Sequence, residues 1–161
     1  MTVWMRFVGP HFTMQVPSEW MVISSMQFQV MFLSPPLSDG RSFNLILVLQ
    51  TSPQTPQYHL QEMHTAKSQE QPDFKLVAEG DFVTHSGTSG AHLSFTARYD
   101  NDQIILQRHV IFKVQNTLYW FMISIPTDIS TELREGVEEI IQTMLTSFTF
   151  TEINLETLLA R

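Results

Sequence analysis

The sequence predicts an α+β fold in which a largely antiparallel β-sheet is flanked by helices. Short runs of apolar, β-branched and aromatic residues recur along most of the chain, separated by Gly, Pro, Asn and Asp. Such runs are typical of strands joined by tight turns. Two longer segments, residues 57–71 and 130–147, contain no Pro and predict helices. One helix between the strands and one after them favour a layered sandwich.

The first half of the chain is predicted to form short strands and one helix. Gly9-Pro10 separates the first two strands, and the turn Pro17–Trp20 places Trp20 against the core. Residues 43–50 are apolar on both faces, which is typical of an interior strand covered on both sides. The elements expected here are strands over residues 3–8, 12–16, 27–34 and 43–50 and a helix over residues 57–71.

The second half is predicted to form a meander followed by a helix. Residues 74–85 are extended, and the strands after them are joined by turns of Gly, Ser, Asn and Asp. Pro126 ends the sheet. From Leu133 to Phe148 apolar residues recur at spacings of three and four, which predicts an amphipathic helix. The elements expected here are strands over residues 91–99, 103–115 and 117–125, a helix over 130–147 and a short strand over 148–150.

Length, charge and cysteine content exclude several classes of protein. The 161 residues predict one domain over residues 1–150 and a loosely held tail over 151–161. The absence of Cys excludes disulfides, Cys-bound metal and a thiol nucleophile. The net charge of -7, without a Lys/Arg cluster, argues against binding to nucleic acid or to anionic membranes. Without an apolar run of spanning length or a signal peptide at residues 1–10, we expect a cytoplasmic protein.

No residue pattern indicates catalysis, a metal site or a cofactor. His59 and His64 lie five apart, whereas two zinc ligands on one helix face are four apart. Ser89 lies in Gly87-Thr88-Ser89-Gly90, which is not the nucleophile turn of hydrolases. Asp100 and Asp102 are explained by turn formation. The sequence therefore predicts that the protein is not an enzyme and binds no metal or cofactor.

Three stretches carry a likeness to a known family. Phe12–Trp20 holds a strand, a proline and a tryptophan, and Gly80–Val110 holds a glycine turn, a strand and a returning strand. Leu118–Phe121 is followed by Pro126, the amphipathic helix and Leu145–Phe148. With these features the chain, over about residues 10–150, resembles the PsbP/DcrB-like superfamily, whose fold is shared with the Ran-binding Mog-type proteins.

The resemblance implies a PsbP-like α/β sandwich and a non-enzymatic accessory or binding role. Members of the superfamily include photosystem extrinsic subunits, periplasmic lipoproteins and cytoplasmic chaperones of secreted effectors. The chain lacks the leader and the lipid-anchoring cysteine of the lipoproteins, and it has no photosynthetic targeting segment. These differences favour the cytoplasmic effector-chaperone branch.

Methionine is the residue that most favours a binding surface. There are 9 Met in the chain, and this flexible side chain is common on surfaces that accept varied apolar partners. The strands around residues 31 and 120 are apolar on both faces, so they predict either an ordinary two-sided core or an apolar groove that receives a partner segment. The residues predicted to line such a groove are Met31, Trp120, Phe121 and Met122.

Arg108 interrupts the apolar face of its predicted strand. A buried guanidinium without a partner is costly, so Arg108 either forms a structural ion pair, extends its head to solvent or anchors a bound chain. Together these features predict a protein-binding accessory protein, most concretely a chaperone or adaptor that shields a hydrophobic segment of a secretion-system effector. The partner expected is a protein with a hydrophobic or amphipathic segment, or a second copy forming a homodimer. A structural subunit of a larger assembly and a small-ligand binder are the alternatives.

Overall fold

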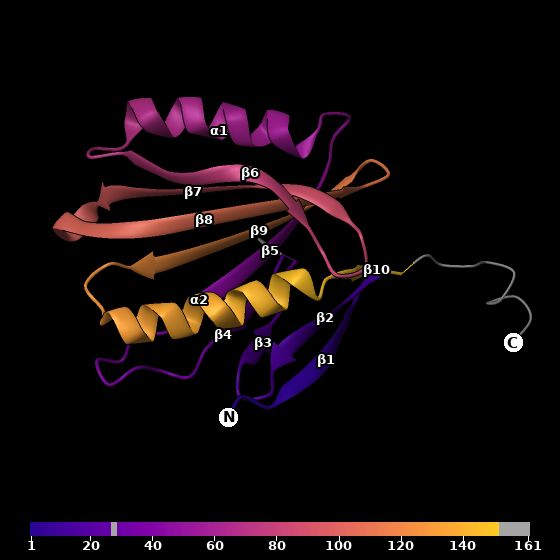
Figure 1. Cartoon of the computed structure of the whole chain (residues 1–161), viewed down its shortest axis with the longest axis horizontal. Coiled ribbons are helices and arrows are strands. Elements are labelled where there is room, and N and C mark those ends of the chain that lie inside the picture. Colours follow the sequence, from indigo (N-terminus) through magenta and orange to yellow (C-terminus); the bar gives the residue numbers. More distant parts are fainter. Residues whose placement is uncertain (27–28, 152–161) are drawn as a thin grey trace, which may run out of the picture.

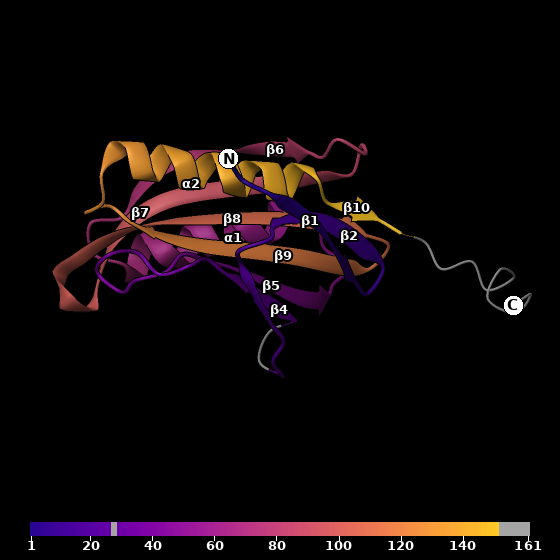
Figure 2. The same cartoon turned by 90° about the horizontal axis from the view of Figure 1, so that it is seen from below.

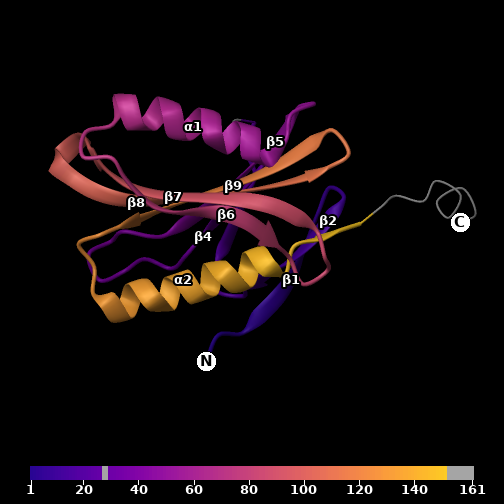
Figure 3. The same ribbon diagram turned by 45° about the horizontal axis from the view of Figure 1, so that its top comes forward.

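The computed structural model describes residues 1–26 and 29–151, and the chain is arranged in layers. A large sheet lies in the middle (Figure 1). Helix α1 (Pro56–Glu70) covers one face of it, and helix α2 (Thr131–Thr146) lies against the other (Figure 3). A small sheet shares the α2 side (Figure 2). This arrangement confirms the predicted α+β class with helices flanking antiparallel strands.

Every neighbouring pair of strands in the two sheets is antiparallel. The seven strands of the large sheet lie in the order β3 (Met21–Ile23), β4 (Val30–Leu33), β5 (Asn44–Thr51), β9 (Thr117–Pro126), β8 (Gln103–Val114), β7 (Ser89–Tyr99) and β6 (Lys75–Val83). The small sheet contains β1 (Trp4–Gly9), β2 (Phe12–Pro17) and β10 (Thr149–Phe150). A single 3-10 turn, Asp100–Asp102, connects β7 to β8.

The predicted helices are found within one residue of their expected ends. Thr55 caps α1 and Ser130 caps α2, each accepting a hydrogen bond from a backbone N–H three residues on. The strand predicted over 27–34 is observed at Val30–Leu33, and residues 27 and 28 lie outside the described residues. Strand β3 was not predicted, because its three residues are too few to show a period.

The main core lies between the large sheet and the layer of α2 and the small sheet. Phe148 is at its centre and is fully buried. Its ring centroid lies 4.8 Å from that of Phe112 and 5.3 Å from that of Phe12, so it joins the end of α2 to both sheets. Stacked aromatic rings at these separations stabilise beyond the area they bury.

A smaller core lies under α1, which packs against β7 and β8. Beyond the helix the same face of β5 is only half-covered: Ile46 and Val48 are half-buried, whereas Leu45 and Leu47 on the other face are at most 1% exposed. A helix about 10 Å wide spans roughly two strands that are about 4.8 Å apart. The prediction that this strand is covered on both sides is therefore correct for one face only.

Two further predictions concern the C-terminal tail and the lack of a membrane-spanning segment. The backbone N–H of Thr151 donates to the carbonyl of His11 at 2.7 Å, so the chain is still held at this point. The remainder of the predicted tail, residues 152–161, lies outside the described residues. Neither helix in the described part of the chain is long and apolar enough to cross a membrane.

Candidate binding groove beside the last helix

An open groove of about 890 Å³ runs along one side of α2. Its other walls come from the start of the chain, from the turn after β2 and from the loop between β4 and β5. A volume of this size lies within the range of ligand sites. We call this feature the α2 groove, and its lining side chains are Met1, Thr2, Trp4, Trp20, Ser34, Pro35, Leu37, Phe43, Ser130, Glu132, Leu133, Val137, Glu139, Ile140 and Thr143, together with Gly136.

Two tryptophans form one wall, and both are positioned at Pro17. Trp4 pairs with Pro17 in the β1–β2 register, and the backbone N–H of Trp20 donates to the Pro17 carbonyl at 3.0 Å. Trp20 is 7% exposed and belongs to the main core, which confirms the predicted turn. Trp4 is half-buried, so its ring is available at the surface of the groove.

Helix α2 supplies the opposite wall. Leu133, Val137 and Ile140 follow one another at spacings of three and four and therefore share a face. Val137 is buried, but Leu133 is 37% exposed. At Gly136 no atom lies within 4 Å of the place that a Cβ would occupy, so the glycine leaves space in this wall.

The polar part of the groove is acidic. Glu132 and Glu139 line it, and no Lys or Arg is among the described residues of the lining. Apolar walls with carboxylates at the edge complement a partner segment that combines apolar and cationic side chains.

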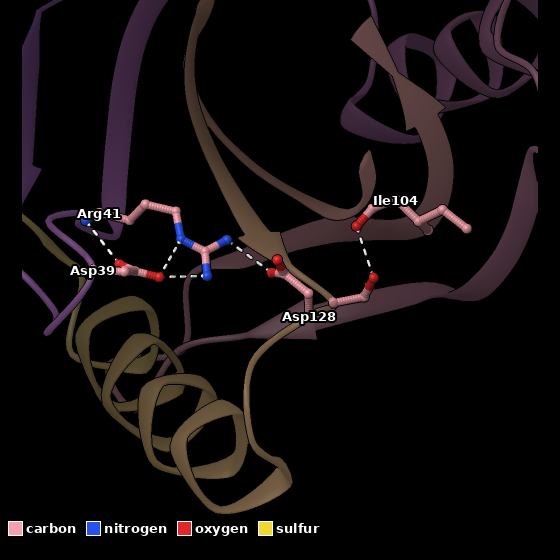
Figure 4. A network of polar contacts seen from close by, with 5 residues as sticks. Asp39, Arg41, Ile104 and Asp128 are labelled. Atoms are coloured by element: carbon pink, nitrogen blue, oxygen red, sulfur yellow. Dashed lines mark hydrogen bonds and ion pairs between the residues drawn. The ribbon is translucent and has the colours of Figure 1, made fainter. Parts of the chain in front are cut away.

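An ion-pair network fixes the loop wall (Figure 4). The Arg41 guanidinium donates to Asp39 and, across 87 residues of sequence, to Asp128, each at 2.7 Å. The guanidinium lowers the pKa of both carboxyl groups. The backbone N–H of Leu37 donates to the Arg41 carbonyl at 2.7 Å. The loop that presents Leu37 is thus tied to the segment that leads into α2.

The neighbouring segment is fastened at a second point. The Thr127 hydroxyl donates to the Ile104 carbonyl at 2.7 Å (Figure 4). The start of α2 is therefore anchored both to β8 and to the β4–β5 loop.

Three predicted residues, Met31, Trp120 and Met122, lie on the α1 side of the large sheet, and Ile46 lies between the two methionines. Met31 pairs with Ile46, and Ile46 pairs with Met122, so the three form a row across β4, β5 and β9. All three are half-buried, and Met21 at the sheet edge is 60% exposed. We call Met21, Met31, Ile46 and Met122 the methionine patch. It lies on the part of this face that α1 leaves uncovered.

Trp120 lies next to this patch in a polar network. Its Nε1–H donates to Nδ1 of His109 at 3.1 Å, and its ring lies 6.0 Å from that of His59. His59 in turn contacts the Ser52 hydroxyl at 2.7 Å. His109 is 4% exposed, and burial, with a smaller contribution from Lys67, lowers its pKa to about 4. The network therefore holds a neutral imidazole beneath Trp120.

The structure separates the other two predicted residues from the patch. Phe121 faces the opposite side of the sheet, is 1% exposed and lies 5.9 Å from the Phe148 ring, so it belongs to the main core. Arg108 also faces the α2 side, where a guanidinium N–H donates to Oε1 of Gln142 at 2.6 Å. Burial lowers the pKa of Arg108, and Glu138 opposes that effect.

The two helical histidines have separate partners. His59 contacts Ser52, whereas His64 lies 3.8 Å from a carboxylate oxygen of Glu79 and stacks on Phe74. Within residues 1–26 and 29–151 no cluster of three potential metal ligands is present.

A scan of protein-family models finds no match to the sequence, and a search of curated proteins finds none either. Solved structures do match. PsbP (CyanoP) from Synechocystis sp. PCC 6803 is 14% identical, with a TM-score of 0.62 over 93% of this chain and 94% of that chain. LpqN of Mycobacterium tuberculosis, described as involved in cell envelope biogenesis, is 13% identical, with a TM-score of 0.62 over 93% and 91%.

The Saccharomyces cerevisiae Ran-binding protein Mog1p is a further match. It is 12% identical, with a TM-score of 0.59 over 94% of this chain and 97% of that chain. At these identities the likeness concerns the fold, and it extends over nearly the full length of each protein.

Proposed function

We propose that this protein, which has the PsbP/Mog1-like fold, is a non-enzymatic accessory protein and binds an amphipathic segment of another protein. The α2 groove is the observation that carries the proposal. One neighbour in fold, Mog1p, is described as binding a protein, Ran, which supports an interaction role. Fold alone does not select a partner, so the partner's chemistry is inferred from the groove.

The proposed occupant is a segment with one apolar face flanked by Lys or Arg. Its apolar side chains would contact Trp4, Leu133 and Ile140, and its cations would approach Glu132 and Glu139. Burial of one Leu-sized side chain contributes about 1.5–3 kcal/mol, so a few such contacts give a measurable affinity. Charge at the edge adds orientation and speeds encounter.

The most concrete form of the proposal is a cytoplasmic chaperone or adaptor that shields a hydrophobic segment of a secretion-system effector. The apolar groove and the resemblance to a superfamily that includes effector chaperones support this role. A structural subunit of a larger assembly would use the same surface for permanent docking. The two roles differ in stoichiometry, since a chaperone leaves with its client and a subunit remains with a large particle.

The methionine patch is a second proposed contact surface. Met31 and Met122, with Trp120 beside them, are half-buried and adaptable, which suits a varied apolar partner. None of the four residues of the methionine patch is acidic, whereas Glu132 and Glu139 line the α2 groove. We therefore place the cationic segment in the groove and test the patch beside it.

Binding is tested with a fluorescent peptide of Leu and Lys in amphipathic order, added to the full chain and followed by anisotropy. Leu133→Glu is expected to weaken binding about tenfold or more, because it removes an apolar contact and would place a carboxylate against the apolar face of the peptide. Leu76→Glu is the matched control: Leu76 is 42% exposed on β6, against 37% for Leu133, and is not part of the groove. It is expected to stay within about twofold of wild type.

Two further arms make the test decisive. A peptide of the same composition in scrambled order, without an apolar face, is expected to bind at least about tenfold more weakly. Loss of binding on Met31→Glu but not on Leu133→Glu would move the site to the methionine patch. Equal binding of the ordered and scrambled peptides, or no binding of either, would refute the proposed function.

A further inference from the structure

A second and smaller cavity lies on the other side of α2, and most of the hydrogen-bonding capacity of its polar side chains is unused. It has a volume of about 190 Å³ and opens between α2 and strands β6, β7, β8 and β9. None of its lining residues belongs to the α2 groove. Its lining residues are Val77, Ala78, His92, Ser94, Leu106, Arg108, Ile123, Ile125, Glu138 and Ile141.

Arg108 is the charged group of this cavity. A guanidinium carries five N–H donors, and the structure gives Arg108 one hydrogen bond, to the neutral amide of Gln142. In the described part of the chain no carboxylate oxygen forms an ion pair with it. Arg108 is half-buried and Glu138 balances its charge only in part, so its remaining donors are available to an anion in the cavity.

Two further polar side chains face the same space. Ser94 is directly opposite Arg108 in the β7–β8 register and is 7% exposed. Its hydroxyl makes no hydrogen bond with any other described residue, and neither does the His92 ring, which packs edge-on against the ring of Phe82. Among the described residues only the Tyr99 hydroxyl, outside this cavity, is a fully buried side-chain polar atom without a partner, so the Ser94 and His92 groups are open to solvent. Three side chains with free hydrogen-bonding capacity therefore converge on one cavity.

The remaining walls and charges restrict the ligand. Leu106, Ile123 and Ile141 make most of the cavity apolar. Glu138 also lines it and partly balances Arg108, while Glu79 and Asp81 act on His92 from β6. A doubly charged anion would be repelled by these carboxylates, whereas a singly charged one could be paired with Arg108 alone. The volume equals that of about six water molecules, which limits the ligand to a few non-hydrogen atoms.

We propose that this cavity binds a monocarboxylate with a short apolar tail. The carboxylate accepts hydrogen bonds from the Arg108 guanidinium and from the Ser94 hydroxyl, and the tail packs on Leu106 and Ile123. A guanidinium matches a carboxylate with two parallel hydrogen bonds, which gives both strength and orientation. The same chemistry is offered by a free short-chain acid and by the C-terminal carboxylate of a peptide that ends in a small apolar residue.

The test uses sodium butyrate and the isotope-labelled full chain, with binding read from NMR shifts of Ser94 and of the Arg108 side chain. Arg108→Gln is expected to weaken butyrate binding about tenfold or more, and Ser94→Ala about fivefold. Arg6→Gln, at an exposed arginine on β1, is the matched control and is expected to leave the affinity unchanged. Thermal midpoints of all variants establish that each one is folded.

Two comparisons identify the ligand chemistry. Butylamine has the same tail without the carboxylate and is expected not to bind. A tripeptide ending in Val with a free carboxylate is compared with its C-terminal amide, and binding of the acid alone, lost in Arg108→Gln, assigns the site to peptide C-termini. The proposal is overturned if neither carboxylate binds, if Arg108→Gln has no effect on either, or if sulfate gives the same shifts at the same concentration.

Discussion

Acid is expected to destabilise the fold through His109. This residue is 4% exposed, and it accepts a hydrogen bond on Nδ1 from Trp120. Its other nitrogen, Nε2, lies 3.2 Å from Oε1 of Gln107, to which it donates in the neutral form. Protonation would put a proton on Nδ1, where it would face the Trp120 N–H, and would place a positive charge among buried rings. Both effects disfavour the charged form.

The expected loss follows from the two pKa values. The pKa of His109 is about 4 in the folded protein, against 6.5 for an ordinary histidine. Between pH 6.5 and pH 4 the unfolded chain binds more protons than the folded one. The contribution of His109 to the free energy of unfolding is therefore fully present above pH 6.5 and is lost as the pH is lowered toward 4. The difference of about 2.5, at about 1.4 kcal/mol for each pKa unit, gives a complete loss of about 3.5 kcal/mol, of which about 3 kcal/mol is reached at pH 4, where half of the folded His109 is protonated.

The assay is urea denaturation of wild type, His109→Gln and His85→Gln at several pH values between 7 and 4. The wild type is expected to lose about 3 kcal/mol more over this interval than His109→Gln does. The exposed His85 provides the matched control, whose variant should follow the wild type. Burial also lowers the pKa of His92, which adds a loss of the same sign to every variant. Parallel curves for wild type and His109→Gln would refute the reasoning.

Two further predictions concern the backbone and the loop wall. At Gly90 an added Cβ would lie 2.2 Å from the carbonyl oxygen of Ile111. Gly90→Ala is therefore expected to lower the free energy of unfolding, measured by urea denaturation, by about 3 kcal/mol. Gly136→Ala, in open space within α2, is the control and should raise it by about 0.5–1 kcal/mol. A stable Gly90→Ala would contradict the close approach of β7 and β8. Arg41→Ala is expected to weaken peptide binding in the α2 groove several-fold and to speed amide hydrogen exchange at Leu37. The denaturation midpoint should change little, because exposed ion pairs contribute little to stability. Unchanged exchange at Leu37 would show that the network does not hold the loop.

Much of the fold is visible in the sequence because periodicity is local. The helix predicted over 130–147 is observed at Thr131–Thr146, and the alternation in residues 117–125 correctly assigns Phe121 to one face and Trp120 to the other. The PsbP-like sandwich implied by the resemblance is confirmed by the structural matches. The sequence pattern does not show how far α1 reaches across the sheet. Because α1 stops short of β5, Ile46 is half-buried.

The α2 groove was not predicted, because its walls come from segments far apart in the chain. Trp4, Leu37 and Leu133 share no spacing that a helix or strand would produce. Two weak signals were present: tryptophans on either side of the first hairpin, and a large apolar residue in the first turn of a capped helix. Arg108 was singled out correctly as a charge on an apolar face, but its cavity depends on the packing of α2 against β8.

The central claim is that an amphipathic cationic segment binds in the α2 groove. The most direct test is photo-crosslinking of the Leu/Lys peptide, with the reactive group on its apolar face, to the full-length protein, followed by mass spectrometric mapping. The account predicts crosslinks at Trp4, Leu133 and Ile140 that are lost when excess unlabelled peptide is added. Crosslinks at Met31 and Met122 instead, or a pattern that unlabelled peptide does not displace, would contradict it.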